Sequence, residues 1–164
     1  MKNGKVKIAP FEGRFQPFFK SLNEAWIRSY GWEIEAADSK TLDYPQENII
    51  DRGGFIFIAL CEGEPVGTLA MFPLEGRNGE FELAKFAVNP AARKNGIGES
   101  LMRAAFDKAR EVGARRLYLE SNTRCESAIR MYRRLGFREI EAQHSEFERC
   151  NIQMEFAIGQ SRRS

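Results

Sequence analysis

Residues 86–99 combine a turn and side chains that suit the binding of an anion. An apolar run leads into a short turn that carries Arg93 and Lys94, and two glycines, Gly96 and Gly98, stand where a helical pattern begins. Glycine lets the backbone approach a ligand closely, and the unpaired amides and positive dipole end of a first helical turn favour phosphate. The two cations add positive charge at the same place. The stretch therefore indicates either a phosphate site or a plain tight turn with a solvated Arg-Lys pair.

Two common nucleotide motifs do not fit this stretch. The Walker motif ends in Gly-Lys-Ser/Thr, which is absent here. The Rossmann fingerprint requires a third small residue at the position where Leu101 stands. A phosphate-bearing ligand would therefore be bound in some other way.

The spacing of apolar residues predicts the elements that position this turn. Steps of three and four residues predict amphipathic helices over 15–29, 97–112 and 127–135. Residues 30–42 fit no clear pattern, and a short helix is expected between Tyr44-Pro45 and Gly53-Gly54. Hairpins come first and a strand–helix–strand–helix–strand unit follows, which favours a mixed sheet flanked by helices. The predicted strands are 5–11, 55–61, 66–72, 80–88, 116–120, 137–140 and 151–158.

Length and composition limit the class of protein. The 164 residues are 43% hydrophobic and 29% charged, with a net charge of +2. This balance suits a single globular domain, predicted over 5–158 with a frayed tail at 159–164, and argues against a dedicated nucleic-acid binder. No apolar run reaches the ~18–20 residues that cross a bilayer, and the first twenty residues lack the apolar core of a secretory signal. We therefore expect a cytoplasmic location.

Histidine and cysteine are too few for a metal site. The three cysteines are widely spaced and form no CxxC pattern, and the single histidine, His144, has no second histidine with which to share a metal. A Ser-His-Asp triad would depend on His144 alone, which we interpret as a surface residue in a polar loop. The sequence therefore predicts a metal-free, reduced enzyme or binding domain.

Three blocks of the sequence follow one another in an order that matches a known family. A strand-like block covers residues 82–88, the pattern Arg93-x-x-Gly96-x-Gly98 follows it, and a helical block with Ala, Tyr and a terminal Gly-Phe covers residues 128–137. Together they resemble the GNAT superfamily of acyl-CoA-dependent N-acyltransferases, whose signature is Gln/Arg-x-x-Gly-x-Gly/Ala between a strand and a helix. The resemblance extends over most of the chain.

The resemblance implies an α/β (α+β) fold with a central mixed, mostly antiparallel twisted sheet of about seven strands and about four flanking helices. Two parallel strands, here 82–88 and 116–120, would splay apart and hold acetyl-CoA, the cosubstrate, in the notch. Backbone groups of the first strand would pair with the pantetheine arm, and amides at the helix start would bind the pyrophosphate. The family often has Asn where Cys125 stands, and Asn122 is the nearby substitute. The implied cofactor-binding residues are Phe86, Ala87, Val88, Arg93, Lys94, Asn95, Gly96, Ile97, Gly98, Glu99, Asn122 and Ser127.

The resemblance also implies a reaction, in which a primary amine attacks acetyl-CoA directly in a ternary complex. A lysine-like amine has a pKa of ~10.4 and must first lose a proton. Glu82 matches the strand glutamate that some histone-acetylating relatives use as the base, and Tyr132 matches the family's general acid. A free backbone N–H near Val88 would stabilise the oxyanion. From the local pattern alone, Glu82 is interpreted as a solvated residue on the outward face of a strand, and Tyr132 is interpreted as a core residue.

The position of Glu82 along its strand limits its role. Without a bulge, strand alternation places Glu82 on the same face as Phe86 and Val88. Glu82 then lies about 20 Å from Val88, since a strand rises ~3.3 Å per residue. A role as base therefore requires a bulge, bridging waters or an extended amine.

The acceptor amine is not identified by the sequence. It is expected on a small molecule or a protein, with no nucleic-acid or membrane partner, and the sequence leaves the oligomeric state open between a monomer and a homodimer. The alternative function is a catalytically idle acyl-CoA-binding or interaction domain. The first predicted helix has an aromatic stripe, interpreted as core, and a polar flank that the resemblance places at the amine site. The stripe is Phe15, Phe18, Phe19 and Trp26, and the flank is Arg14, Gln16 and Asn23.

Overall fold

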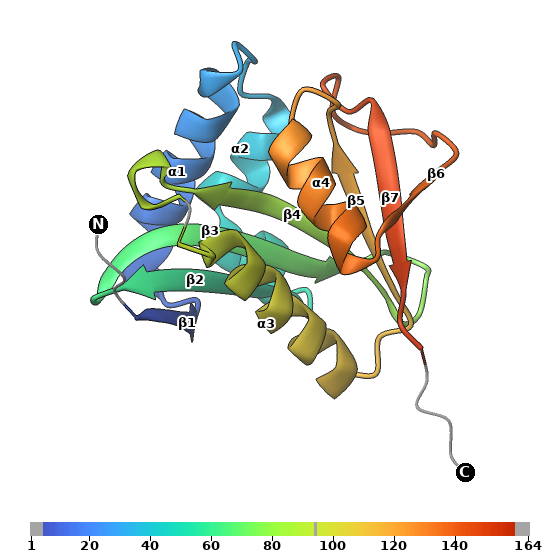
Figure 1. Cartoon of the computed structure of the whole chain (residues 1–164), viewed down its shortest axis with the longest axis horizontal. Coiled ribbons are helices and arrows are strands. Elements are labelled where there is room, and N and C mark those ends of the chain that lie inside the picture. The colour runs from blue at the N-terminus through green and yellow to red at the C-terminus, as the bar shows by residue number, and fades with distance from the viewer. Residues whose placement is uncertain (1–4, 94, 160–164) are drawn as a thin grey trace.

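A single twisted sheet forms the centre of the protein, as a computed structural model shows for residues 5–93 and 95–159 (Figure 1). Its seven strands run in the order β1-β2-β3-β4-β5-β7-β6, and every neighbouring pair is antiparallel except β4 and β5. The predicted mixed, mostly antiparallel sheet is confirmed. The strands are β1 (Val6–Pro10), β2 (Phe55–Cys61), β3 (Glu64–Pro73), β4 (Glu80–Val88), β5 (Arg116–Ser121), β6 (Arg138–Ile140) and β7 (Ile152–Ala157).

Helices cover both faces of the sheet, with α3 and α4 in front and α1 and α2 behind in Figure 1. Their bounds are α1 (Gln16–Ser29), α2 (Ala36–Asp43), α3 (Ile97–Glu111) and α4 (Glu126–Leu135). Successive residues of β2 pack against the helices on opposite faces of the sheet, because side chains along a strand point alternately to its two faces. Ile58 belongs to the core cluster with Phe19 of α1, whereas Phe57 belongs to the cluster with Leu101 of α3. In the described part of the chain, no helix has both the length and the apolar character to traverse a bilayer.

The predicted helices agree with the structure to within about two residues, and the unassigned stretch contains a further one. That helix, α2, begins with a capping box in which Glu35 and Asp38 each accept a hydrogen bond from the other's backbone amide. The helix expected after Pro45 is a single π turn over Gln46–Ile50.

The parallel strands β4 and β5 separate after a short common stretch. They pair over four residues, from Glu80 opposite Arg116 to Leu83 opposite Leu119. Beyond this point β4 runs on to Val88 while β5 turns away from it (Figure 1). The predicted splayed pair is therefore confirmed, and none of the described residues pairs with residues 84–88 of β4 on the β5 side.

A bulge interrupts β4 at Lys85, whose φ is +55°. On the β3 side, Thr68 pairs with Ala87 and Ala70 with Ala84, so two residues of β4 stand opposite one residue of β3. A positive φ is costly for a residue with a side chain, and such conformations persist where neighbouring groups hold them in place.

The bulge reverses the alternation of side chains in β4. Leu83 and Phe86 both pack in the core beneath α3 and α4, although they are three positions apart and an unbroken strand would place them on opposite faces. Between them, Lys85 points to the other face, where its ammonium contacts Asp38 of α2. The placement of Glu82 and Phe86 on one face was conditional on an unbroken strand, and the bulge removes that condition.

Candidate active site

A cavity of about 600 Å³ lies where β4 and β5 diverge. Its walls come from both strands, the start of α3, one side of α4, the end of α1 and the loop before β7. This size is typical of small-molecule sites. The cavity brings together Glu82, Tyr132 and most of the predicted cofactor residues. These are Phe86, Ala87, Val88, Arg93, Gly96, Ile97, Gly98, Glu99, Asn122 and Ser127.

The α3 end of the cavity is rich in positive charge. Gly96 caps α3 with a φ of +69°, a conformation that favours glycine, and Arg93 lies just before it. Arg130 and Arg134 of α4 line the same cavity, and Arg134 donates to Glu99 at 3.0 Å. Neither arginine was predicted from the sequence. Their i, i+4 spacing is the signal that would have placed them on one face of the helix.

Some predicted cofactor residues have other contacts in the structure. The Asn95 side chain donates to the Ala92 carbonyl at 2.9 Å and holds the turn, and Lys94 lies outside the described residues. A Cβ on Gly98 would stand 3.0 Å from the ring of Phe86. Gly98 therefore makes room for this ring as well as for any ligand.

Asn122 supports the loops around the cavity. Its amide nitrogen donates to the Arg149 carbonyl at 2.7 Å, and its oxygen accepts from the Arg124 amide at 2.8 Å. Cys125, which replaces the family's asparagine, is buried and also lines the cavity. A contact between Asn122 and a cofactor stays a prediction.

Two carboxylates meet at the β4–β5 side of the cavity. Glu120 accepts hydrogen bonds from Tyr118 at 2.7 Å and from Ser145 at 2.6 Å. Burial, and then the negative charge of Glu120, raises the pKa of Glu82 to about 8. A carboxylate with this pKa can take up a proton near neutral pH, as a general base must.

Tyr132 is fixed by ring packing on α4. Its ring centroid lies 6.2 Å from that of Phe86 and 5.9 Å from that of Phe137, and the residue is buried while it also lines the cavity. Burial, and then the nearby Cys125, raises the pKa of the Tyr132 phenol above its ordinary value. The phenol therefore keeps its proton at neutral pH and has one to donate.

Aromatic residues at the end of α1 form a wall of the cavity that the sequence analysis missed. Trp26, Tyr30 and Trp32 line the cavity, and the rings of Tyr30 and Trp32 are stacked 4.7 Å apart. Arg124 places its guanidinium 5.4 Å from both ring centroids. Trp26 belongs to the stripe interpreted as core, whose members Phe15 and Phe19 do lie in the core. Trp26 lies beyond them, where the helix passes the edge of the cavity.

The polar flank of α1 divides in the same way. Asn23 lines the cavity, as predicted. Gln16 donates instead to the Leu42 carbonyl at 2.8 Å, and Arg14 is exposed beside Glu12. Asn23 lies further along the helix toward the cavity than Arg14 and Gln16. Helical periodicity gives the face on which a residue lies but not its position along the axis.

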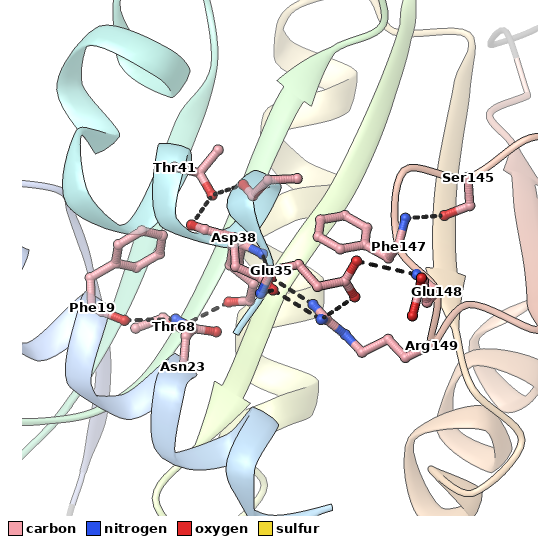
Figure 2. Close-up of polar contacts among 12 residues, drawn as sticks. Phe19, Asn23, Glu35, Asp38, Thr41, Thr68, Ser145, Phe147, Glu148 and Arg149 are labelled. Carbon is pink, nitrogen blue, oxygen red and sulfur yellow. Dashed lines mark hydrogen bonds and ion pairs between the residues drawn. The ribbon is translucent and has the colours of Figure 1, made fainter. Parts of the chain in front are cut away.

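A buried ionic network joins α2, β4 and the loop before β7 (Figure 2). The side chain of Asp38 is fully buried and accepts from Lys85 at 2.6 Å and from both terminal nitrogens of Arg149, at 2.9 and 2.6 Å. Arg149 also contacts Glu35 at 3.2 Å. Burial by itself would raise the pKa of Asp38, but the hydrogen bond from Arg149 and the charge of Lys85 outweigh it and hold the pKa at about 2.

This network should make the protein sensitive to acid. A carboxyl with a pKa of about 2 when folded and about 3.8 when unfolded stabilises the fold by about 2 kcal/mol at neutral pH. The contribution is complete above about pH 5, and we expect about 1 kcal/mol of it to be lost by pH 3. Urea unfolding of wild type and of Asp38→Asn at neutral pH and at about pH 3 measures this loss, because the variant lacks the titrating group. The same loss of unfolding free energy in both proteins would contradict the assignment.

Comparison with known proteins places the chain in a family. The model of the Acetyltransferase (GNAT) family matches residues 16–137. YjgM of Escherichia coli K12, an uncharacterized N-acetyltransferase, is 40% identical over 90 residues, which are 54% of this chain and 54% of YjgM. The matched region thus spans about half the length of this curated relative.

Solved structures show the same fold. A GNAT-family acetyltransferase from Staphylococcus aureus Mu50 superposes with a TM-score of 0.85 at 20% identity, covering 93% of this chain and 99% of that one. A GNAT-family acetyltransferase from Brucella melitensis, solved in complex with acetyl-CoA, superposes with a TM-score of 0.71 at 21% identity, covering 96% and 90% of the two chains.

Proposed function

The chain belongs to the Acetyltransferase (GNAT) family, and we propose that it transfers an acetyl group from acetyl-CoA to a primary amine by direct attack in a ternary complex. The observation that carries this proposal is the separation of β4 from β5 after Leu83, which opens a cavity between Glu82 and Tyr132. One residue has a pKa suited to accepting a proton and the other retains a proton to donate.

The residues of the cavity fit acetyl-CoA, which supplies the activated thioester when bound. Residues 84–88 of β4 leave their backbone groups free on the β5 side, where they can pair with the amide groups of a pantetheine arm. The arginines near α3 and its first-turn amides suit a pyrophosphate.

Because of the bulge, the thioester and the amine would approach β4 from opposite faces of the sheet. Phe86 packs toward α3 and α4, the side on which the thioester would enter. Glu82, near Lys85 and Glu120, faces the α1 and α2 side, from which the amine would approach. The Phe86 N–H, next to the bulge, replaces the Val88 N–H as the candidate oxyanion donor, because it lies only four residues from Glu82, or at most about 13 Å along the strand. A bridging water or the amine itself spans this shorter gap.

Replacing Arg93 with glutamine is expected to weaken CoA binding about 10-fold at low salt. A charge-assisted hydrogen bond contributes ~1.5–3 kcal/mol, and solvent reduces this for an exposed arginine. The effect should shrink as salt rises. Calorimetry with CoA measures it. Arg103→Gln is the matched control, because Arg103 is an exposed α3 arginine that does not line the cavity, although its partner Glu99 does. Equal weakening in both variants would argue against a phosphate contact by Arg93.

The proposed function is tested by incubating the protein with acetyl-CoA and a panel of amines and following the release of CoA thiol. The panel should contain peptide N-termini, lysine derivatives, amino acids and amino sugars. Amine-dependent thiol release is the expected result. CoA binding without release for any amine would favour the idle binding domain.

Three further expectations from the sequence stay proposals. They are the domain bounds 5–158, the cytoplasmic location and the absence of a metal from the reaction.

A further inference from the structure

The bulge in β4 is held by a hydroxyl on the neighbouring strand. Thr68 of β3 is fully buried, and its Oγ1 donates to the Lys85 carbonyl at 2.8 Å. This carbonyl belongs to the peptide that links Lys85 to Phe86. The contact therefore sets the orientation of the peptide unit at the bulge.

A second buried side chain fixes the direction in which Thr68 donates. The Asn23 amide nitrogen donates to Thr68 Oγ1 at 3.0 Å and to the Phe19 carbonyl at 2.8 Å, as Figure 2 shows. A hydroxyl has one hydrogen and two lone pairs. Because Asn23 uses a lone pair, the hydrogen of Thr68 is left for the Lys85 carbonyl.

The geometry of the peptide carries this orientation to the cavity. In a planar trans peptide, the N–H points opposite to the C=O. The Lys85 carbonyl points toward Thr68 on β3, so the Phe86 N–H points away from β3, to the side from which β5 has separated. None of the described residues is a ladder partner on that side. A flipped peptide would instead turn its carbonyl oxygen toward the cavity, where it would repel a developing oxyanion.

We propose that Thr68, itself oriented by Asn23, is a positioning residue that aims the Phe86 N–H at the thioester carbonyl oxygen. The inference rests on the proposed function, because it assigns a role within that reaction. It also gives α1 and β3 a part in the chemistry through two side chains that are buried.

The test compares two substitutions of Thr68 that differ in one group. Thr68→Val replaces the hydroxyl with a methyl group of similar shape, whereas Thr68→Ser keeps the hydroxyl. We expect the valine variant to lose 10- to 100-fold in kcat, since loss of one oxyanion donor costs 10²–10³-fold in other acyl transfers and a misaimed donor costs less. The serine variant should stay within about 3-fold of wild type. The affinity for CoA should change in neither.

An infrared measurement separates positioning from a merely structural role. With acetyl-CoA carrying ¹³C at the thioester carbonyl, hydrogen bonding to the Phe86 N–H should lower the carbonyl stretch in wild type and in Thr68→Ser. The shift should disappear in Thr68→Val. If that variant is poorly folded, Asn23→Leu/Thr68→Val also removes the buried Asn23 amide, whose partner Thr68→Val takes away, and should lose the shift as well.

The outcomes separate the positioning role from the proposed function. If Thr68→Val shows the same carbonyl shift and the same kcat as wild type, the positioning role is overturned, while the proposed function stays intact. An equal loss of kcat in Thr68→Val and Thr68→Ser would also overturn it, because the hydroxyl would then not be the determinant. If none of the amines in the panel causes wild type to release thiol, the proposed function fails. The infrared comparison needs no amine and still decides whether Thr68 aims the Phe86 N–H.

Discussion

Turnover of the Glu82→Gln variant is expected to fall by about 10²–10⁴-fold, because glutamine fills the same space but cannot take up a proton. A base works only when ionised, and the pKa of Glu82 is about 8. In wild type, kcat/KM for an amine of low pKa should therefore rise as the pH increases through about 8 and then level off, because kcat/KM reports the groups of the free enzyme. The glutamine variant should lack this acidic limb. A pH–rate profile of both proteins measures the difference.

Glu120→Gln provides a control for the same profile. The negative charge of Glu120 helps to raise the pKa of Glu82. Removing that charge should lower the pKa of Glu82 and move the acidic limb to lower pH, while leaving the base in place. A profile that neither variant alters would assign proton removal to solvent or to another group.

Tyr132→Phe should also lower kcat by about 10²–10⁴-fold, with almost no change in CoA affinity. Phenylalanine keeps the packing against Phe86 and Phe137 and deletes only the hydroxyl. Without a proton donor, the departing thiolate must leave as an anion. The measurement is steady-state turnover on the amine found in the panel, together with calorimetry for CoA.

The leaving group gives this second prediction its sharpest control. An acetyl thioester of a strongly acidic aryl thiol needs no protonation on departure. The Phe variant should therefore lose far less activity with it than with acetyl-CoA. If the variant works at the wild-type rate with acetyl-CoA, Tyr132 has only a packing role.

The sheet and the main helices were predictable because their signals are local. Apolar spacing located α3 and α4, and the strand–turn–helix around Gly96 indicated an anion site. The family resemblance added the splayed strands. It also selected Glu82 and Tyr132, which the structure places on one cavity.

The bulge could not be predicted, because contacts distant in sequence hold it. Thr68 lies 17 residues from Lys85, and Asp38 lies 47 residues from it. The alternation rule assumes an unbroken strand, and nothing in the local run around Lys85 contradicts that assumption. For the same reason Arg149 was missed, since it reaches Asp38 across 111 residues.

The four-residue ladder between β4 and β5 is the connection between two parts of the sheet. Strands β1 to β4 form one plate joined by long antiparallel ladders, and β5, β7 and β6 form another. Few backbone hydrogen bonds cross between the plates, because only four residue pairs join β4 to β5. The ladder lies at the closed end of the cavity, so the cavity occupies the gap between the two plates. On the far face, the contact of Asp38 with Arg149 is a second link between the plates.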